Sequence, residues 1–235
     1  SYDRCFRGAG ADLVEIGDSG NTEPWELEEA TALETHLGFN HRIIETRENE
    51  EPGYAANGAR RCYFCKTHLY SHFNNIATKE GYSYVIDGST TDDLKEFRPG
   101  GEAAKEWAVK SPLVDVGLNK KEIRELSHAL GLPTWDKPAQ ACLSSRIPYG
   151  TPVSAEALSQ IAKAEEFLHN LGIKQLRVRH HGTLARIEVE PQDFLILTNN
   201  DTREKVTKYF RSIGYAYITL DMEGFRSGSL NEVLS

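Results

Sequence analysis

The first 131 residues alternate between strand-like and helix-like segments, and this alternation constrains the fold more than any other feature of the sequence. Short stretches of alternating apolar and polar residues predict strands, and longer stretches with apolar residues on one helical face predict helices. Strands are expected at 12–17, 41–46 and 82–88, and helices at about 24–37, 61–80 and 119–130. Such alternation is typical of an α/β domain with a parallel sheet.

Capping residues define the helix expected at 119–130 most sharply. Asn119 is placed to cap its start, with Glu122 three residues later to complete a capping box. Gly131 is placed to end it. Its apolar residues are expected to face the interior of the protein: Ile123, Leu126 and Leu130.

The alternation of strands and helices is interrupted at residues 133–153, which indicates a junction between two units. The segment contains four prolines, at positions 133, 138, 148 and 152. Beyond it, the sequence predicts a helix capped by Ser154, a hairpin turning at Gly182, a second helix from about Asp201 and a strand at 215–220. We therefore expect a first domain at 1–150 and an α+β C-terminal domain at 151–235.

The composition narrows the class of protein. No apolar run approaches the roughly 20 residues of a membrane span, so no membrane partner and no signal peptide are expected. A formal net charge of −8 argues against a protein that wraps nucleic acid. Four scattered cysteines do not form a secreted disulfide framework, which favours a reducing cytoplasm.

Two of those cysteines, Cys62 and Cys65, lie three residues apart in "RCYFCK". If a helix begins near Arg61, both thiols share one inward-facing stripe with Leu69, Phe73 and Ile76. The long polar loop before them makes a redox pair the weaker interpretation. Zinc needs four ligands, whereas three thiolates, with Cys142 as the third, suit a [4Fe-4S] cluster with one open iron. Spacing alone leaves metal binding and simple packing both open.

The junction stretch "KPAQACLSSRIPYG" (137–150) brings a thiol, two hydroxyls and a guanidinium together within five residues. These residues are Cys142, Ser144, Ser145 and Arg146. A loop of this kind at a domain junction is a common place for a ligand site, and its alternative is a plain linker.

The predicted hairpin carries a charged face opposite Leu176, Val178, Ile187 and Val189. That face holds Arg177, Arg179, Arg186 and Glu188. Arginines beside a carboxylate suit a phosphate and its metal ion, but from this segment alone a solvated face with cross-strand pairs is the stronger interpretation. Glu165 and Asp193 join this face only if their helix and loop pack against it.

The acidic stretch after the third expected strand, "VIDGSTTDDLKEFRPGG", is the other candidate site. It would lie at the carboxyl end of a parallel sheet, where ligands bind. Asp87, Asp92, Asp93 and Arg98 would lie there. The acidic cluster could bind Mg²⁺, or could equally form a polar loop with Asx turns. The sequence contains no GxGxxG, Walker A, GxSxG or HExxH motif.

Seven motifs in their order along residues 15–232 resemble the LarE family of ATP-dependent sulfur transferases. They are "RCYFCK", "DGSTTDD", "FRPG", "KSPL", "GLPTWDKPAQACLSSRIPYG", "RVRHHGTLARIEV" and "FRSGSLNE". The resemblance implies a PP-loop ATP-binding domain with a smaller C-terminal domain, and a homo-oligomer, often a hexamer. It also implies that ATP adenylylates a carboxylate of pyridinium-3,5-dicarboxylate mononucleotide, which sulfur converts to a thiocarboxylate for the nickel-pincer cofactor.

The resemblance also assigns roles to residues. One branch of the family sacrifices the sulfur of a cysteine at or beside position 142. The other holds a [4Fe-4S] cluster with an extra sulfide, and Cys62, Cys65 and Cys142 match that branch. The same resemblance implies that Arg177 and Arg179 bind phosphate. It implies metal-binding or active-site roles for Glu165, Glu188 and Asp193, and it places Ser144, Ser145 and Arg146 along the same junction.

The sequence departs from the family at the phosphate loop, SGGxDS, because nothing in residues 1–14 matches it. The first domain is therefore expected to lack its first strand and this loop, and we favour the interpretation that a longer protein carries them. The residues leave two other interpretations open. A tRNA-thiolating PP-loop enzyme would need a basic surface, and a non-catalytic zinc- or cluster-binding protein would not need ATP.

Overall fold

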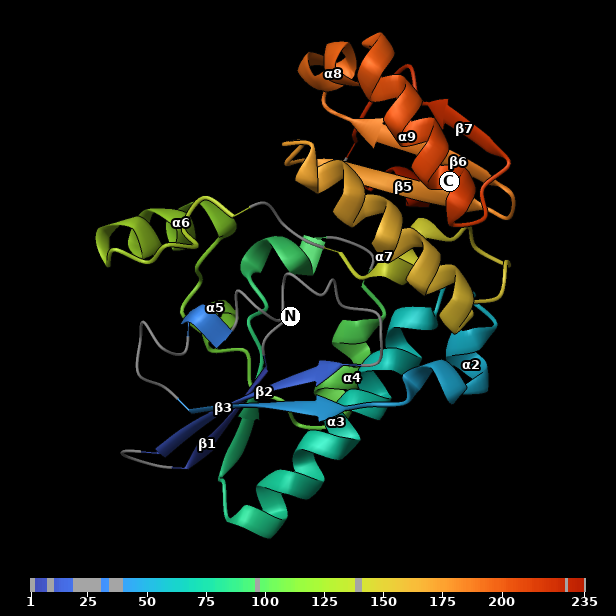
Figure 1. Ribbon diagram of the computed structural model, residues 1–235. Coiled ribbons are helices and arrows are strands. Elements are labelled where there is room, and N and C mark those ends of the chain that lie inside the picture. The colour runs from blue at the N-terminus through green and yellow to red at the C-terminus, as the bar shows by residue number, and fades with distance from the viewer. Residues whose placement is uncertain are drawn as a thin grey trace. The chain divides into compact units, whose positions relative to one another are not determined.

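The computed structural model describes residues 3–7, 11–18, 31–33, 40–95, 98–137, 141–226 and 228–234 (Figure 1). The helix expected at about 24–37 lies almost wholly outside these residues, although 31–33 are helical. The described residues form two compact units, one at 3–137 and one at 141–234. Residues 141–150 therefore belong to the second unit.

The first unit contains a four-stranded sheet in the order β3-β2-β1-β4. The strands are β1 (Asp3–Arg7), β2 (Ala11–Asp18), β3 (Asn40–Glu45) and β4 (Tyr84–Ile86). β2 and β3 are parallel, and β1 is antiparallel to both β2 and β4. The three expected strands thus point the same way. The expectation of an all-parallel sheet is wrong for β1, whose sequence DRCFR lacks an apolar alternation.

The helical segments of the first unit follow the expected order and add several short turns. They are η1 (Glu48–Glu50), α2 (Pro52–Ala55), α3 (Arg61–Glu80), η2 (Thr91–Lys95), α4 (Gly100–Glu106), α5 (Pro112–Asp115) and α6 (Lys120–Ala129). α3 ends where Gly81 adopts a left-handed conformation with φ 75°. Leu69, Phe73 and Ala77 of α3 pack with Val85 and Ala103 to form the core of this unit.

Helix α6 has the predicted cap but not the predicted burial. The Asn119 side chain accepts from the Glu122 backbone at 3.0 Å, and the Glu122 carboxylate accepts from the Asn119 backbone at 2.9 Å. However, Leu126 and Leu130 are 49% and 76% exposed. The inward-facing prediction is wrong for them, because the described part of the first unit does not cover this face of α6.

The second unit is a three-stranded sheet, β5-β6-β7, with helices on its apolar face. Its elements are η3 (Leu143–Arg146), α7 (Ala155–Asn170), β5 (Leu176–His181), β6 (Leu184–Val189), η4 (Pro191–Asp193), α8 (Phe194–Thr198), α9 (Asn200–Ser212), β7 (Tyr217–Leu220) and η5 (Ser229–Leu234). β5 and β6 form the expected hairpin, and β7 runs parallel to β6. Val178 and Ile187 pack against Leu168 of α7 and Phe210 of α9. Ser154 caps α7 as predicted, accepting from the Ala157 backbone at 3.2 Å.

Among the described residues, no helix combines the length and the apolar character that crossing a membrane requires.

Candidate functional site: a buried arginine cluster beside Cys142

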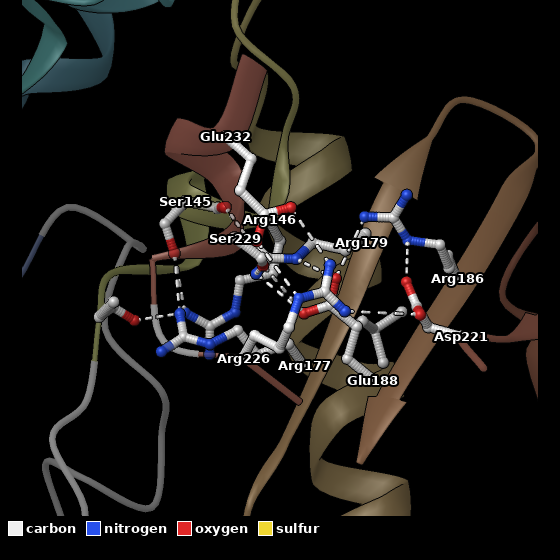
Figure 2. A network of polar contacts seen from close by, with 12 residues as sticks. Ser145, Arg146, Arg177, Arg179, Arg186, Glu188, Asp221, Arg226, Ser229 and Glu232 are labelled. Carbon is white, nitrogen blue, oxygen red and sulfur yellow. Dashed lines mark hydrogen bonds and ion pairs between the residues drawn. The ribbon is translucent and has the colours of Figure 1, made fainter. Parts of the chain in front are cut away.

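The charged face of the β5–β6 hairpin is buried, so the expectation of a solvated face is wrong. Arg177, Arg179 and Glu188 are 8%, 4% and 1% exposed. The loop that carries Ser145 and the segment that carries Ser229 lie against this face and bond to its arginines (Figure 2). Buried charges require partners, and the partners of each arginine decide what the cluster can bind.

Arg179 and Glu188 form a two-pronged ion pair across the hairpin. Arg179 Nε and Nη2 donate to Glu188 Oε1 and Oε2, each at 2.9 Å. The same guanidinium reaches the Ser145 carbonyl at 2.7 Å and the Ser229 hydroxyl at 2.6 Å. Arg186, from β6, also donates to Glu188 at 3.1 Å. Arg179 therefore joins the hairpin to the Ser145 loop and to the C-terminal segment.

Arg146 and Glu165 form a second pair of the same geometry. Arg146 Nε donates to Glu165 Oε1 at 2.9 Å, and Nη2 donates to Oε2 at 2.6 Å. Arg146 Nη1 donates to the backbone carbonyls of Ala141 and Cys142 and to the Ser145 hydroxyl. Because Glu165 lies on α7, this pair ties the Cys142 loop to that helix.

Arg177 differs from these two arginines because it has no carboxylate partner among the described residues. Its Nη1 donates to the Ser145 hydroxyl at 3.3 Å, and its guanidinium lies 5.1 Å from the centre of the Phe225 ring. Burial, and then the neighbouring Arg146 and Arg179, lower the pKa of Arg177 to about 10. The guanidinium is still charged at neutral pH, so the described cluster carries an uncompensated positive charge that suits an anion.

Two other predicted residues stand apart from these contacts. Ser144 is fully buried, next to Ser145 in η3. Asp193 ends η4, and its carboxylate makes no hydrogen bond or ion pair with any other described residue. The structure thus brings Ser145, Arg146, Glu165, Arg177, Arg179 and Glu188 together, and it does not bring Asp193 into their network.

Cys62 and Cys65 lie in the first unit, and Cys142 lies in the second. Cys62 is exposed in the first turn of α3, and Cys65 is half-buried, with its thiol 3.9 Å from Glu48 Oε1. The prediction that both face inward is wrong for Cys62, because the buried apolar residues of α3 begin two turns later, at Leu69. Cys142 is exposed just before η3. Within the described parts of the chain, no three His, Cys, Asp or Glu side chains form a group that could hold a metal ion.

The Asp87 carboxylate accepts hydrogen bonds from several donors of its own unit. Its carboxylate accepts from the Ser111 hydroxyl at 2.7 Å, from the Ser89 hydroxyl at 2.8 Å and from the Ser89 backbone at 3.1 Å. The Tyr70 hydroxyl adds a contact at 3.3 Å. The bond to the Ser89 backbone is an Asx turn, which was one of the two interpretations of this stretch.

The other acidic residues after β4 are also engaged locally. Asp92 accepts from the Lys120 backbone at 2.7 Å. Asp93 accepts from the Thr90 backbone at 2.9 Å and pairs with Arg98 at 3.0 Å and Lys120 at 3.1 Å. Burial alone would raise the pKa of Asp93, but the Thr90 bond and the two cations outweigh it and lower the pKa. These contacts organise the loop and the start of α6.

Phe225 and Ser229 cover the cluster from the C-terminal side, and the sequence did not predict them as part of the site. The only signal was the motif "FRSGSLNE" itself, which gives no indication of what it contacts. In the structure, Arg226 of this segment also pairs with Glu232 at 3.2 Å (Figure 2). It pairs with Glu223 as well, at 2.8 Å.

The described residues thus define a two-unit protein of mixed helices and sheets, whose second unit carries an exposed thiol, Cys142, beside a buried cluster with one excess positive charge. No family model matches the chain. An uncharacterized protein of Synechocystis is 45% identical over 212 residues, which cover 90% of this chain and 79% of the relative. The pyridinium-3,5-bisthiocarboxylic acid mononucleotide synthase of Lactiplantibacillus plantarum is 34% identical over 213 residues, covering 89% and 75%. An uncharacterized protein of Methanocaldococcus jannaschii is 31% identical, covering 86% and 77%.

The chain therefore belongs to the family of that synthase, the LarE family of sulfur transferases, and it is an enzyme.

Proposed function

We propose that this enzyme transfers sulfur to a carboxylate of pyridinium-3,5-dicarboxylate mononucleotide, in an ATP- and Mg²⁺-dependent step on the way to a nickel-pincer cofactor. The relative from Lactiplantibacillus plantarum is named for the bisthiocarboxylic acid that such a reaction produces. The observation that carries the proposal is the uncompensated positive charge of Arg177 next to the loop of Cys142.

The position of Arg177 favours a substrate with a phosphate. Arg146 and Arg179 are neutralised by Glu165 and Glu188, so the excess charge is concentrated on Arg177. Arg177 bonds to the Ser145 hydroxyl, and the Ser145 backbone donates to the Cys142 carbonyl at 2.9 Å. A mononucleotide phosphate bound to Arg177 would thus be held by the loop that carries the thiol. Arginine forks suit phosphate oxygens well.

ATP supplies the leaving group in this proposal. A substrate carboxylate attacks the α-phosphorus, pyrophosphate leaves, and an acyl adenylate forms. Sulfur then attacks the acyl carbon, a C–S bond replaces the C–O bond, and AMP leaves. Asp87, Asp92 and Asp93 would shape the ATP and Mg²⁺ site through the loop they organise, and the half-exposed Arg98 would contact phosphate. Asp193 is a further candidate for Mg²⁺ or for proton transfer.

Three cysteines are proposed to hold a [4Fe-4S] cluster. Cys62 and Cys65 are one helical turn apart, Cys62 exposed and Cys65 half-buried, and Cys142 is exposed; none of the three forms a disulfide. Thiolates are the usual ligands of such clusters, so the three thiols suit the group by their chemistry, although the described residues do not bring three ligands together. When bound by three protein ligands, the cluster supplies an open iron that carries an extra sulfide. Free thiols also suit a reducing cytoplasm, and a homo-oligomer remains an expectation from the family resemblance.

Anaerobic purification followed by iron, sulfide and zinc analysis tests the cluster. We expect about four irons per chain, and their loss in Cys142→Ala. One zinc and no iron, or unchanged iron in that variant, would contradict the cluster assignment. Incubation with substrate, ATP, Mg²⁺ and sulfide tests the reaction: mass spectrometry should detect replacement of a carboxylate oxygen by sulfur together with one AMP per sulfur. Conversion without ATP would contradict the adenylate route.

A further inference from the structure

We infer that Arg146 and Glu165 form a latch that fixes the backbone of Cys142, and that both residues affect the reaction only through this loop. The inference rests on the proposed sulfur transfer. It makes Arg146 and Glu165 positioning residues, whereas the family resemblance gave Arg146 a ligand-lining role and Glu165 an active-site role.

The contacts of Arg146 occupy its guanidinium from all sides. Nε and Nη2 point at Glu165, and Nη1 points at two carbonyls and a hydroxyl of the loop. The side chain is 2% exposed. A guanidinium has N–H donors on three nitrogens and no acceptor, and here each of the three nitrogens donates to protein atoms. A substrate has no exposed surface of Arg146 to contact.

Glu165 is engaged in the same way. One oxygen accepts from Arg146 Nε and from the Val178 backbone, at 2.9 Å and 2.6 Å, and the other accepts from Arg146 Nη2. Its side chain is 6% exposed. A general base must come within hydrogen-bonding distance of the proton that it removes, and both oxygens of this carboxylate already accept from donors of the described chain. Instead, Glu165 connects α7, strand β5 and, through Arg146, the Cys142 loop.

The latch acts on the backbone of Cys142 and leaves its side chain exposed. The Cys142 carbonyl accepts from the Ser145 backbone at 2.9 Å and from Arg146 Nη1 at 3.1 Å, which uses both of its lone pairs. Arg146 also binds the preceding carbonyl, of Ala141. A thiol that ligates a cluster or presents sulfur must be held within a fraction of an ångström of its working position. A fixed backbone beneath an exposed thiol meets this requirement.

The experiment compares Glu165→Gln, Arg146→Met and the double variant Arg146→Met/Glu165→Met with the wild-type enzyme. Each single change leaves a buried charge without its ion-pair partner and could unfold the second unit. Replacing both partners with apolar side chains removes both buried charges, so the unit should stay folded. Ser154→Ala is the matched control, because it weakens the cap of α7, the helix that carries Glu165, without touching the loop. Hydrogen exchange of the Ser145 amide, the alkylation rate of Cys142, kcat and KM are measured for each, and kcat is measured as a function of pH.

We expect the Ser145 amide to exchange faster and the alkylation rate of Cys142 to change in all three latch variants. We expect kcat to fall by about 10- to 100-fold, as a shift of about 1 Å in a reacting group would cause, with little change in KM. The double variant should be no slower than the worse single variant, because the two residues act as one unit. Ser154→Ala should leave all four measurements unchanged.

A double variant that keeps wild-type kcat and Ser145 protection would overturn the latch. So would an intact loop in Glu165→Gln combined with loss of the acidic limb of the pH–rate profile, since Glu165 would then transfer protons itself. Exchange and alkylation need no turnover. If the wild-type enzyme transfers no sulfur, the proposed function fails, yet these two measurements still confirm or contradict the latch.

Discussion

Replacing Arg177 with methionine should stabilise the ligand-free enzyme against unfolding and lower its affinity for phosphate. Burial, and then the neighbouring Arg146 and Arg179, lower the pKa of Arg177 to about 10, which corresponds to about 3 kcal/mol against the charged form. Methionine removes that cost and forfeits one hydrogen bond to Ser145 and the contact with Phe225, each about 1 kcal/mol. The net gain is about 1 kcal/mol, or a rise in Tm of about 2–4 °C.

The same substitution removes the donors proposed for the substrate phosphate. Charge-assisted hydrogen bonds contribute about 1.5–3 kcal/mol each, so the loss of one or two should raise KM about 100-fold. Thermal unfolding with and without inorganic phosphate, together with KM at saturating ATP, measures both effects. Arg177→Lys keeps the charge, so its Tm and its KM should lie between those of the wild-type enzyme and those of Arg177→Met.

A matched change at Arg179 should have the opposite effect on stability. Arg179→Met leaves Glu188, which is 1% exposed, without its two-pronged partner, and breaking a buried pair costs about 3–5 kcal/mol. The reasoning is refuted if Arg177→Met destabilises the ligand-free enzyme as Arg179→Met does, or if its affinity for phosphate is unchanged.

Three further predictions concern stability. Burial, and then the charge of His181, lower the pKa of His180 below its usual 6.5, so in acid the unfolded chain binds more protons than the folded one. The free energy of unfolding should therefore fall as the pH drops below about 6.5. In urea titrations, His180→Gln should reduce this dependence of the unfolding free energy on pH. Phe210 is fully buried, and Phe210→Ala should cost about 3–5 kcal/mol in the same titrations. Asn119→Ala should cost about 1 kcal/mol, seen as faster amide exchange in α6 with unchanged sulfur transfer.

The sequence predicted best where structure is set by neighbouring residues. The caps at Asn119 and Ser154, the hairpin at Gly182 and the order of elements in the second unit are all confirmed. Each depends on contacts within a few positions along the chain, such as a side chain that accepts from a backbone three residues later. The side of the hairpin that meets the core was also correct, since alternation in a strand fixes it.

The failures share one cause, which is that burial depends on distant segments. Arg179 is buried by Ser145 and Ser229, which lie 34 and 50 positions away along the chain. Leu126 has an apolar periodicity yet is exposed, because periodicity does not supply the partner that would cover it. Strand β1 is paired on both edges, and this pairing holds a segment whose own pattern indicates no strand.

The covering of Arg179 by Ser229 has a consequence during translation. Glu188 follows Arg179 by 9 residues, but Ser229 follows it by 50. At about 5–20 residues per second, the ribosome makes the ion pair available seconds before the segment that closes over it. During that interval Arg179 has its ion-pair partner but not the Ser229 hydroxyl, so the C-terminal segment supplies the last of its partners to be synthesised.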